Sequence, residues 1–176
     1  MRSPTTAKSD ENEHCSNHLP TSPVTNSMTE QPTRIGFIGQ GWIGKHYADD
    51  FEKRLYSVVR YALEEPYNAN KVQIKECSVV FVAVPTPTTT EGFQIAAVES
   101  ALSAVAGGTT VVIKSTLIPG MTEQLQEKFP DLYIMHSPEF LAEKTAAHDA
   151  AFPKRNIIGI PVETATYQKR AQQVLD

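Results

Sequence analysis

A set of three glycines has the spacing of a phosphate-binding turn: Gly39, Gly41 and Gly44. They follow the apolar run 34–38 and precede an amphipathic stretch, which gives the order strand, turn and helix. In this pattern the first glycine permits a tight turn, the second lets the backbone approach a pyrophosphate, and the third lets the helix lie close to the strand. The first N–H groups of the helix, at Trp42 and Ile43, would face the anion. The pattern predicts a dinucleotide site, with an ordinary strand-to-helix turn as the alternative.

An acidic residue follows the second predicted strand, residues 57–63. Glu64 stands near the place where NAD-binding folds position a carboxylate that hydrogen-bonds the adenosine ribose. A solvated loop carboxylate would give the same pattern, so both interpretations stay open. Arg60, inside the same strand, could instead pair with a 2′-phosphate, which leaves NADP as a second interpretation of the cofactor.

Hydroxyl side chains follow two later strands. Thr86 lies in a proline-rich loop, 85–90, after the apolar run 78–84, and Thr116 follows the predicted strand 109–113. Open α/β sheets bind ligands beyond the carboxyl ends of their strands, so both threonines are predicted to line the ligand crevice. The structural alternatives are a stiff connector around Thr86 and a common helix-entry residue at Thr116.

Two glutamates follow the next predicted strand, 132–135. Glu139 and Glu143 are four residues apart, so on a helix they would share one face and could bracket a reacting group. Their spacing alone favours solvated charges on a helix surface.

The elements that must position these residues alternate along residues 34–176. Strands are predicted at 34–38, 57–63, 78–84, 109–113, 132–135 and 155–160, and helices at 42–54, 93–106, from 121, and 162–175. The crossover at 69–76 has room for at most a short helix. This alternation predicts an α/β fold, a Rossmann-type doubly wound parallel sheet of about six strands in the order 3-2-1-4-5-6.

Residues 1–33 differ in composition from the rest of the chain. They are rich in Ser, Thr and Pro and poor in apolar residues, so we predict a disordered tail. His14, Cys15 and His18 within it are interpreted as incidental, and no metal site is predicted. The domain is therefore expected to span residues 34–176.

The overall composition suits one domain, with 176 residues of which 40% are hydrophobic. A net charge of -4 gives no general attraction to nucleic acid or to anionic membranes. No apolar stretch has the length of a membrane span, and the N-terminus lacks the apolar core of a signal peptide. Cys15 and Cys77 form neither a disulfide framework nor a C-x-x-C motif, which fits a reducing compartment. We therefore predict a cytoplasmic protein without nucleic-acid or membrane partners.

From Arg34 to about Asp176 the chain resembles the N-terminal domain of the UDP-glucose/GDP-mannose dehydrogenase family. Four segments in the family's order carry this resemblance, with a later match at Pro153–Gly159: Gly39–Gly44, Val84–Pro87, Lys114–Gly120 and Pro138–Glu143. Members of that family oxidise the C6 alcohol of a nucleotide sugar to a carboxylate in two NAD-dependent hydride transfers, through a thioester on a catalytic cysteine. The resemblance implies an NAD-dependent oxidoreductase acting on CH-OH donors, with a UDP-sugar as the expected substrate.

The resemblance also implies roles for individual residues. The three glycines would hold the NAD pyrophosphate, and Thr86 and Thr116 would lie along the nicotinamide. Thr116 would also position the water that hydrolyses the thioester. Glu139 resembles the residue linked to acid/base handling of that water, and Glu143 the one beside the cofactor. Main chain at 139–142 resembles the stretch that contacts the sugar.

Some residues depart from the family's pattern. Ser137, Ala142 and Lys144 stand where Asn, Arg and Gly are common, so the identity of the sugar stays open. The family's central helix, through which its homodimers form, and the Gly-x-Cys nucleophile lie beyond residue 176. We expect a cofactor-binding half that is inactive and monomeric alone. The alternatives are a non-catalytic nucleotide-binding module and a hydroxyacid dehydrogenase of the 6-phosphogluconate type, against which the Pro-Glu-Phe-Leu segment argues.

Overall fold

The computed structural model describes residues 33–142 and 144–176. These residues belong to one compact unit, Gln31–Asp176. The predicted tail, apart from Thr33, and Glu143 lie outside the described residues. Among the helices that are described, none combines the length and apolarity needed to cross a bilayer.

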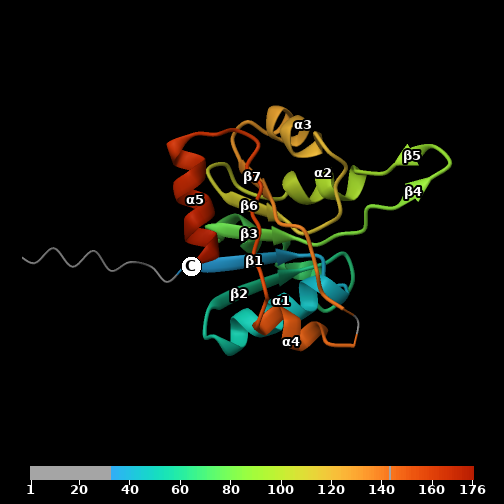
Figure 1. The fold of residues 1–176 in the computed structure, drawn as a ribbon. Helices are drawn as coiled ribbons and strands as arrows, with labels where there is room; N and C mark the ends of the chain where they lie inside the picture. The colour runs from blue at the N-terminus through green and yellow to red at the C-terminus, as the bar shows by residue number, and fades with distance from the viewer. Residues whose placement is uncertain (1–32, 143) are drawn as a thin grey trace, which may run out of the picture. The chain divides into compact units, whose positions relative to one another are not determined.

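A five-stranded parallel sheet forms the centre of the unit (Figure 1). Its strands are β1 (Arg34–Ile38), β2 (Ser57–Tyr61), β3 (Val79–Val82), β6 (Thr110–Ile113) and β7 (Tyr133–His136). The helices are α1 (Trp42–Lys53), α2 (Ala96–Leu102), α3 (Met121–Lys128), α4 (Ala146–Ala151) and α5 (Ala165–Leu175), with 3-10 turns at Asn68–Lys71 and Gln73–Glu76. A small antiparallel hairpin, β4 (Thr88–Thr89) and β5 (Gly92–Phe93), projects beyond the sheet where a proline-rich loop was predicted. The predicted α/β class is confirmed.

The strand order is β2-β1-β3-β6-β7, so the predicted order 3-2-1-4-5-6 is wrong. The third strand in the chain pairs with β1 rather than with β2, in a register that places Gly36 beside Val80. The reason lies in the short crossover after β2, whose buried Ile74 packs under Gly36 and carries the chain across β1. The direction of winding therefore reverses between β1 and β3, which is where sheets of this kind bind ligands.

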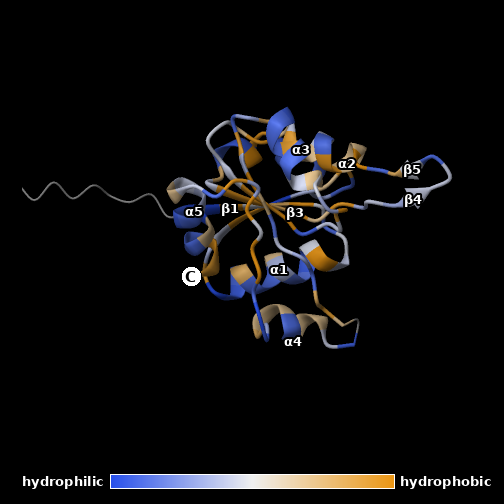
Figure 2. Cartoon of the chain, turned by 45° about the horizontal axis from the view of Figure 1, so that its top comes forward, coloured by the Kyte–Doolittle hydropathy of each residue, from blue (hydrophilic) through white to orange (hydrophobic). Residues whose placement is uncertain are grey.

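Apolar side chains fill both faces of the sheet, because successive strand residues point to opposite sides. One face packs Val80, Val82 and their neighbours against α2 and α3. The opposite face packs Phe37, Phe81 and Val112 against α1. Figure 2 shows hydrophobic residues concentrated in the strands, with polar residues on the outer sides of the helices. Helices thus cover both faces, as a doubly wound fold requires.

The sixth strand predicted at 155–160 does not form. Gly159 makes an isolated antiparallel bridge with His136, with N–H to O distances of 3.0 and 2.7 Å. The segment rises from α4 and crosses in front of the sheet (Figure 1). Its Ile158 lines a groove on the α1 face together with Phe81 and Val112. The apolar run therefore pairs with the edge strand β7 only at Gly159, and Ile158 covers part of the α1 face of the sheet.

Candidate functional site

The glycine turn is tightly packed on one side and open on the other. Gly39 has φ +94°, and a Cβ there would lie 2.2 Å from the Ala83 carbonyl oxygen. A Cβ at Gly44 would lie 2.0 Å from the Gly39 oxygen, so α1 approaches the turn as closely as predicted. A Cβ at Gly41 would meet nothing within 4 Å. The space beside Gly41 is therefore free for a ligand.

The start of α1 presents backbone N–H groups to this space. Gly41 is the N-cap, and no described side chain caps the helix. Trp42 and Ile43 begin the helix, so their N–H groups have no partner within it. The Trp42 side chain is 42% exposed and touches His46 edge-on. Uncapped amides beside an open glycine fit the pyrophosphate of a dinucleotide.

The turn lies at the switch point of the sheet. The Gly39 N–H donates to the Tyr61 oxygen at the end of β2 at 2.9 Å, and the Ala83 N–H after β3 donates to the Ile38 oxygen at 2.8 Å. The end of β1 is thereby held between the ends of its two neighbours. The observed strand order, like the predicted one, places this turn at a switch point beside β1, but the strand across the switch point is β3 rather than the fourth predicted strand.

The two predicted threonines lie side by side. The Thr86 hydroxyl donates to the Thr116 carbonyl oxygen at 3.0 Å. The buried Ser115 hydroxyl fixes the same loops, because it accepts from the Val84 N–H at 2.9 Å and donates to the Val84 oxygen at 2.7 Å. The structure thus joins the loops after β3 and β6. Ser115 belongs to this edge but was not among the predicted site residues.

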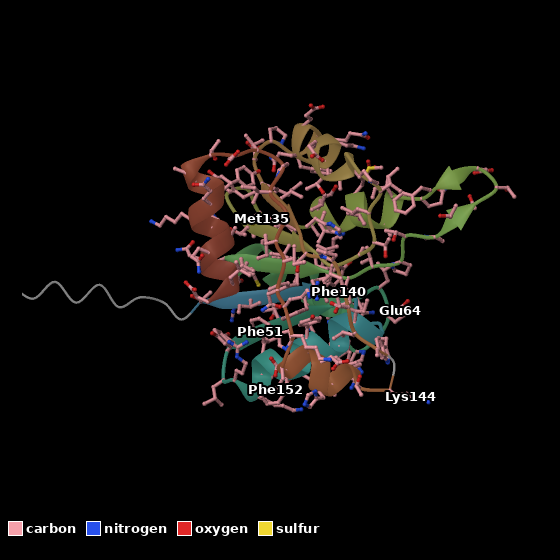
Figure 3. The ribbon with its side chains drawn as sticks, viewed as in Figure 1. Phe51, Glu64, Met135, Phe140, Lys144 and Phe152 are labelled. Atoms are coloured by element: carbon pink, nitrogen blue, oxygen red, sulfur yellow. The ribbon has the colours of Figure 1, made fainter. Side chains whose placement is uncertain are left out.

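Glu64 lies in an exposed loop after β2, at the same edge of the sheet (Figure 3). Its backbone oxygen accepts the Tyr67 N–H at 3.2 Å. Its role as a ribose ligand stays a prediction.

Arg60, which suggested NADP, is held by two carboxylates. Its guanidinium is 3.3 Å from Gln40 Oε1 and 2.7 Å from oxygens of both Asp49 and Glu52. Desolvation opposes its charge, but the two carboxylates outweigh that effect and raise the pKa of Arg60. The guanidinium is therefore charged. Asp49 and Glu52 balance that charge, and the N–H groups of Arg60 already donate hydrogen bonds within the fold.

Glu139 lies in an irregular segment, so the helix on which Glu139 and Glu143 would share one face is not observed at Glu139. Its Oε1 accepts the N–H groups of Phe140 and Leu141 at 2.8 and 3.1 Å, and such local bonds compete with helix formation. The next helix begins only at Ala146.

Two side chains, Tyr47 and Lys114, contact the Glu139 carboxylate on the α1 face of the sheet. The Tyr47 hydroxyl donates to Oε1 at 3.2 Å. The Lys114 ammonium lies 3.2 Å from Oε2, donates to the Ser137 hydroxyl at 3.2 Å, and lies 4.4 Å from the centre of the Tyr47 ring. Oε2 is buried and has no well-directed hydrogen bond from the described residues. Its contact with Lys114 is thus an ion pair.

Burial dominates the electrostatics of this cluster. Desolvation lowers the pKa of Lys114, although the Glu139 charge acts in the opposite direction. Desolvation also raises the pKa of Tyr47, and the adjacent Glu139 charge raises it further. Tyr47 therefore stays protonated and donates its hydrogen bond. Sequence reasoning missed both partners, although a lysine directly after the buried strand 109–113 was a visible signal.

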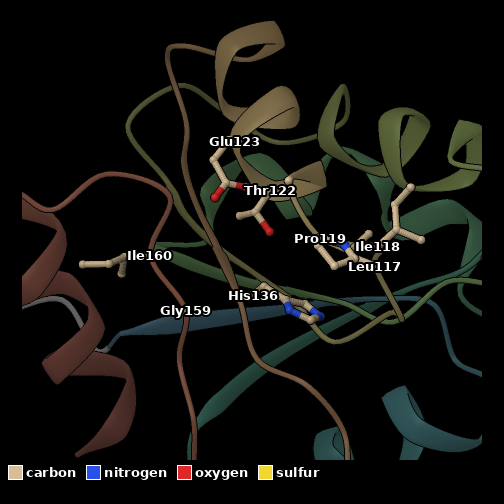
Figure 4. Close-up of a pocket in the computed structure, with 9 residues that line it drawn as sticks. Leu117, Ile118, Pro119, Thr122, Glu123, His136, Gly159 and Ile160 are labelled. Carbon is tan, nitrogen blue, oxygen red and sulfur yellow. The ribbon is translucent and has the colours of Figure 1, made fainter.

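Two hollows adjoin these groups. A groove of about 420 Å³ on the α1 face is lined by Tyr47, Lys114 and Ser137. A smaller cavity of about 290 Å³ lies between the loop after β6, the start of α3 and residues 159–160 (Figure 4). Among the described residues, no predicted site residue lines the smaller cavity. The predicted site is the open carboxyl edge of the sheet rather than this cavity.

The geometry can be compared with known proteins. Residues 46–175 match the model described as "UDP-glucose/GDP-mannose dehydrogenase family, NAD binding domain". The chain belongs to this family. The match covers most of the described unit, so the chain is an NAD-binding domain of a dehydrogenase family, as its sequence predicted.

Several relatives of this family domain resemble the chain. The UDP-glucose 6-dehydrogenase of Streptococcus pneumoniae is 42% identical over 67 residues, which is 38% of this chain and 17% of that protein. UDP-glucose 6-dehydrogenase 1 of Oryza sativa subsp. japonica is 34% identical over 120 residues, covering 58% of this chain and 25% of that protein. The chain thus spans a quarter or less of these relatives.

A solved structure shares the fold of the family domain. The UDP-glucose dehydrogenase from Pyrobaculum islandicum aligns with a TM-score of 0.68 at 23% identity, over 82% of this chain and 43% of that one. At this identity the comparison supports the Rossmann-like fold.

The cysteine inside the domain is predicted to be inert. Cys77 is 4% exposed, and burial raises its pKa to about 11. At pH 8 only about one thiol in a thousand would be the reactive thiolate. We expect Cys77 to stay unmodified by iodoacetamide at pH 8 in the native protein and to react after denaturation in guanidinium. Mass spectrometry of the Cys77 peptide measures this, and rapid native labelling would contradict the buried setting.

Proposed function

We propose that this chain supplies the cofactor-binding part of a nucleotide-sugar dehydrogenase that oxidises the C6 alcohol of a UDP-sugar to a carboxylate. When bound, NAD supplies the hydride acceptor. The chain's own residues bind the dinucleotide and hold polar groups at the edge of the sheet where a substrate would lie. The relatives named UDP-glucose 6-dehydrogenase support the choice of substrate class.

One observation carries this proposal: the space beside Gly41 is open while Gly39 and Gly44 are closely packed. An ordinary strand-to-helix turn would not require open space at the middle glycine between two closely packed ones. A pyrophosphate placed beside Gly41 would accept hydrogen bonds from the N–H groups of Trp42 and Ile43. Glu64 is then within the loop that would receive the adenosine ribose.

Polar groups at the carboxyl edge of the sheet would contact the nicotinamide and position the hydrolytic water. Thr86 and Thr116, joined by their hydrogen bond, would line the nicotinamide side, and Thr116 would orient the hydrolytic water. Glu139 would handle protons of that water, and Glu143 would lie by the cofactor, both on the basis of the family resemblance. The ion pair with Lys114 holds the Glu139 carboxylate in place, where it could accept a proton.

Calorimetric titration of the chain with NAD and, separately, with NADP tests the proposal. We expect saturable binding of NAD and weaker binding of NADP, because Arg60 is already neutralised. Trp42 is the single tryptophan of the chain and adjoins Gly41, so its fluorescence should change in the same NAD titration. Absence of both signals at millimolar NAD would refute the proposed cofactor site.

A further inference from the structure

Arg60 occupies the position where a 2′-phosphate would be recognised. It lies on β2, one residue before the strand ends, and its guanidinium reaches Gln40, which stands between Gly39 and Gly41 in the phosphate turn. In folds of this kind the adenosine ribose lies beside the end of the second strand, and an arginine nearby favours NADP. By position alone, Arg60 would therefore favour the phosphorylated cofactor.

The side chains around Arg60 remove this capacity. Its Nε donates to Glu52 at 2.9 Å, its Nη2 donates to Asp49 at 2.7 Å, and its Nη1 donates to Gln40 at 3.3 Å. The arginine side chain is 10% exposed, whereas those of Asp49 and Glu52 are 32% and 49% exposed. A phosphate approaching from solvent would therefore meet the carboxylates as well as the guanidinium.

The local charge balance also disfavours an added phosphate. Asp49 and Glu52 carry two negative charges against the positive charge of Arg60. Lys45 lies 3.1 Å from the other oxygen of Asp49, and with it the group is neutral. A 2′-phosphate carries close to two negative charges, so a neutral group whose donors are occupied offers it no net attraction.

We propose that Asp49 and Glu52 determine cofactor specificity by neutralising Arg60, so that the site selects a dinucleotide with a free 2′-hydroxyl over one with a 2′-phosphate. Neither residue needs to contact the cofactor. Both act through Arg60 and are therefore positioning residues. The inference rests on the proposed function, since it requires the dinucleotide to lie on the glycine turn.

The test replaces both carboxylates by amides of the same shape, Asp49→Asn with Glu52→Gln. The amide oxygens still accept from Arg60, so the fold keeps its hydrogen bonds while the positive charge becomes unbalanced. Calorimetry with NAD and NADP should show the ratio of the two affinities shifting toward NADP at least tenfold. Adding Arg60→Met to this variant should reverse the shift, which a merely structural effect of the first two changes would not do.

A matched control separates local from overall charge. Glu99→Gln with Glu127→Gln removes the same number of negative charges, on α2 and α3, and should leave the ratio unchanged. If the double amide variant unfolds, Glu52→Gln alone, which changes the more exposed carboxylate, should shift the ratio in the same direction.

An unchanged ratio in the folded variants would overturn this inference and leave the proposed function standing. A shift equal to that of the control pair would also overturn it. Absence of NAD binding by the unmodified chain would overturn the proposed function and, with it, this inference.

Discussion

Replacing Gly41 by valine is expected to weaken NAD binding strongly without unfolding the protein. Gly41 has φ −67° and ψ −170°, an extended conformation that valine adopts readily, and a Cβ there meets no protein atom within 4 Å. The valine side chain would instead fill the space proposed for the pyrophosphate. Loss of two hydrogen bonds to a charged group corresponds to about 3 kcal/mol, or roughly a 100-fold weaker affinity. Calorimetric titration with NAD measures the effect.

Two further glycine variants serve as comparisons for Gly41→Val. Gly107→Val is a matched control beyond the end of α2, where a Cβ lies 3.5 Å from that of Asp131, and it should bind NAD normally. Gly44→Ala should lower the melting temperature sharply, because its Cβ would lie 2.0 Å from the Gly39 oxygen. A folded Gly41→Val protein with unchanged NAD affinity would show that the dinucleotide does not lie on this turn.

Replacing Lys114 by methionine is expected to destabilise the fold by about 3 to 5 kcal/mol at neutral pH. The lysine side chain is 8% exposed and neutralises the Glu139 carboxylate, whose side chain is 13% exposed. Removing the ammonium leaves a buried, uncompensated negative charge. Guanidinium denaturation at pH 7 measures the effect.

The matched control is Lys128→Met on α3. Its ion pair with Glu99 is 2.7 Å long but largely exposed, so its loss should cost at most about 1 kcal/mol. Adding Glu139→Gln to Lys114→Met should recover much of the stability, since no buried charge then remains. A cost for Lys114→Met no greater than that of the control would mean that the Lys114 and Glu139 pair is not held in the interior.

The local elements could be predicted from sequence because each depends on neighbouring residues. Buried apolar runs such as 79–82 and 110–113 favour strands at almost any position in a sheet. The glycine turn was equally local, since the spacing of its three glycines specifies close packing at the first and third and an open space at the second. The α/β class and the phosphate turn therefore followed directly from the pattern.

The strand order and the carboxylate cluster could not be predicted in the same way. Whether the third strand pairs with β1 or β2 depends on how Ile74 packs under Gly36, a contact between residues 38 positions apart in the chain. The cluster joins Tyr47, Lys114 and Glu139 from three separate segments. Spacing within one segment carries no information on such pairings, and the helix on which Glu139 and Glu143 would share a face is not compatible with the local hydrogen bonds of Glu139.

The two hydrogen bonds between Ser115 and Val84 affect the thermodynamics of ligand binding. By donating to and accepting from the Val84 backbone, the Ser115 hydroxyl holds the loops after β3 and β6 together. Loops that are ordered before the ligand binds lose little conformational entropy on association, so the binding free energy is more favourable. Ordering on binding would then be confined to the opposite end of the crevice, in the exposed loop that carries Glu64.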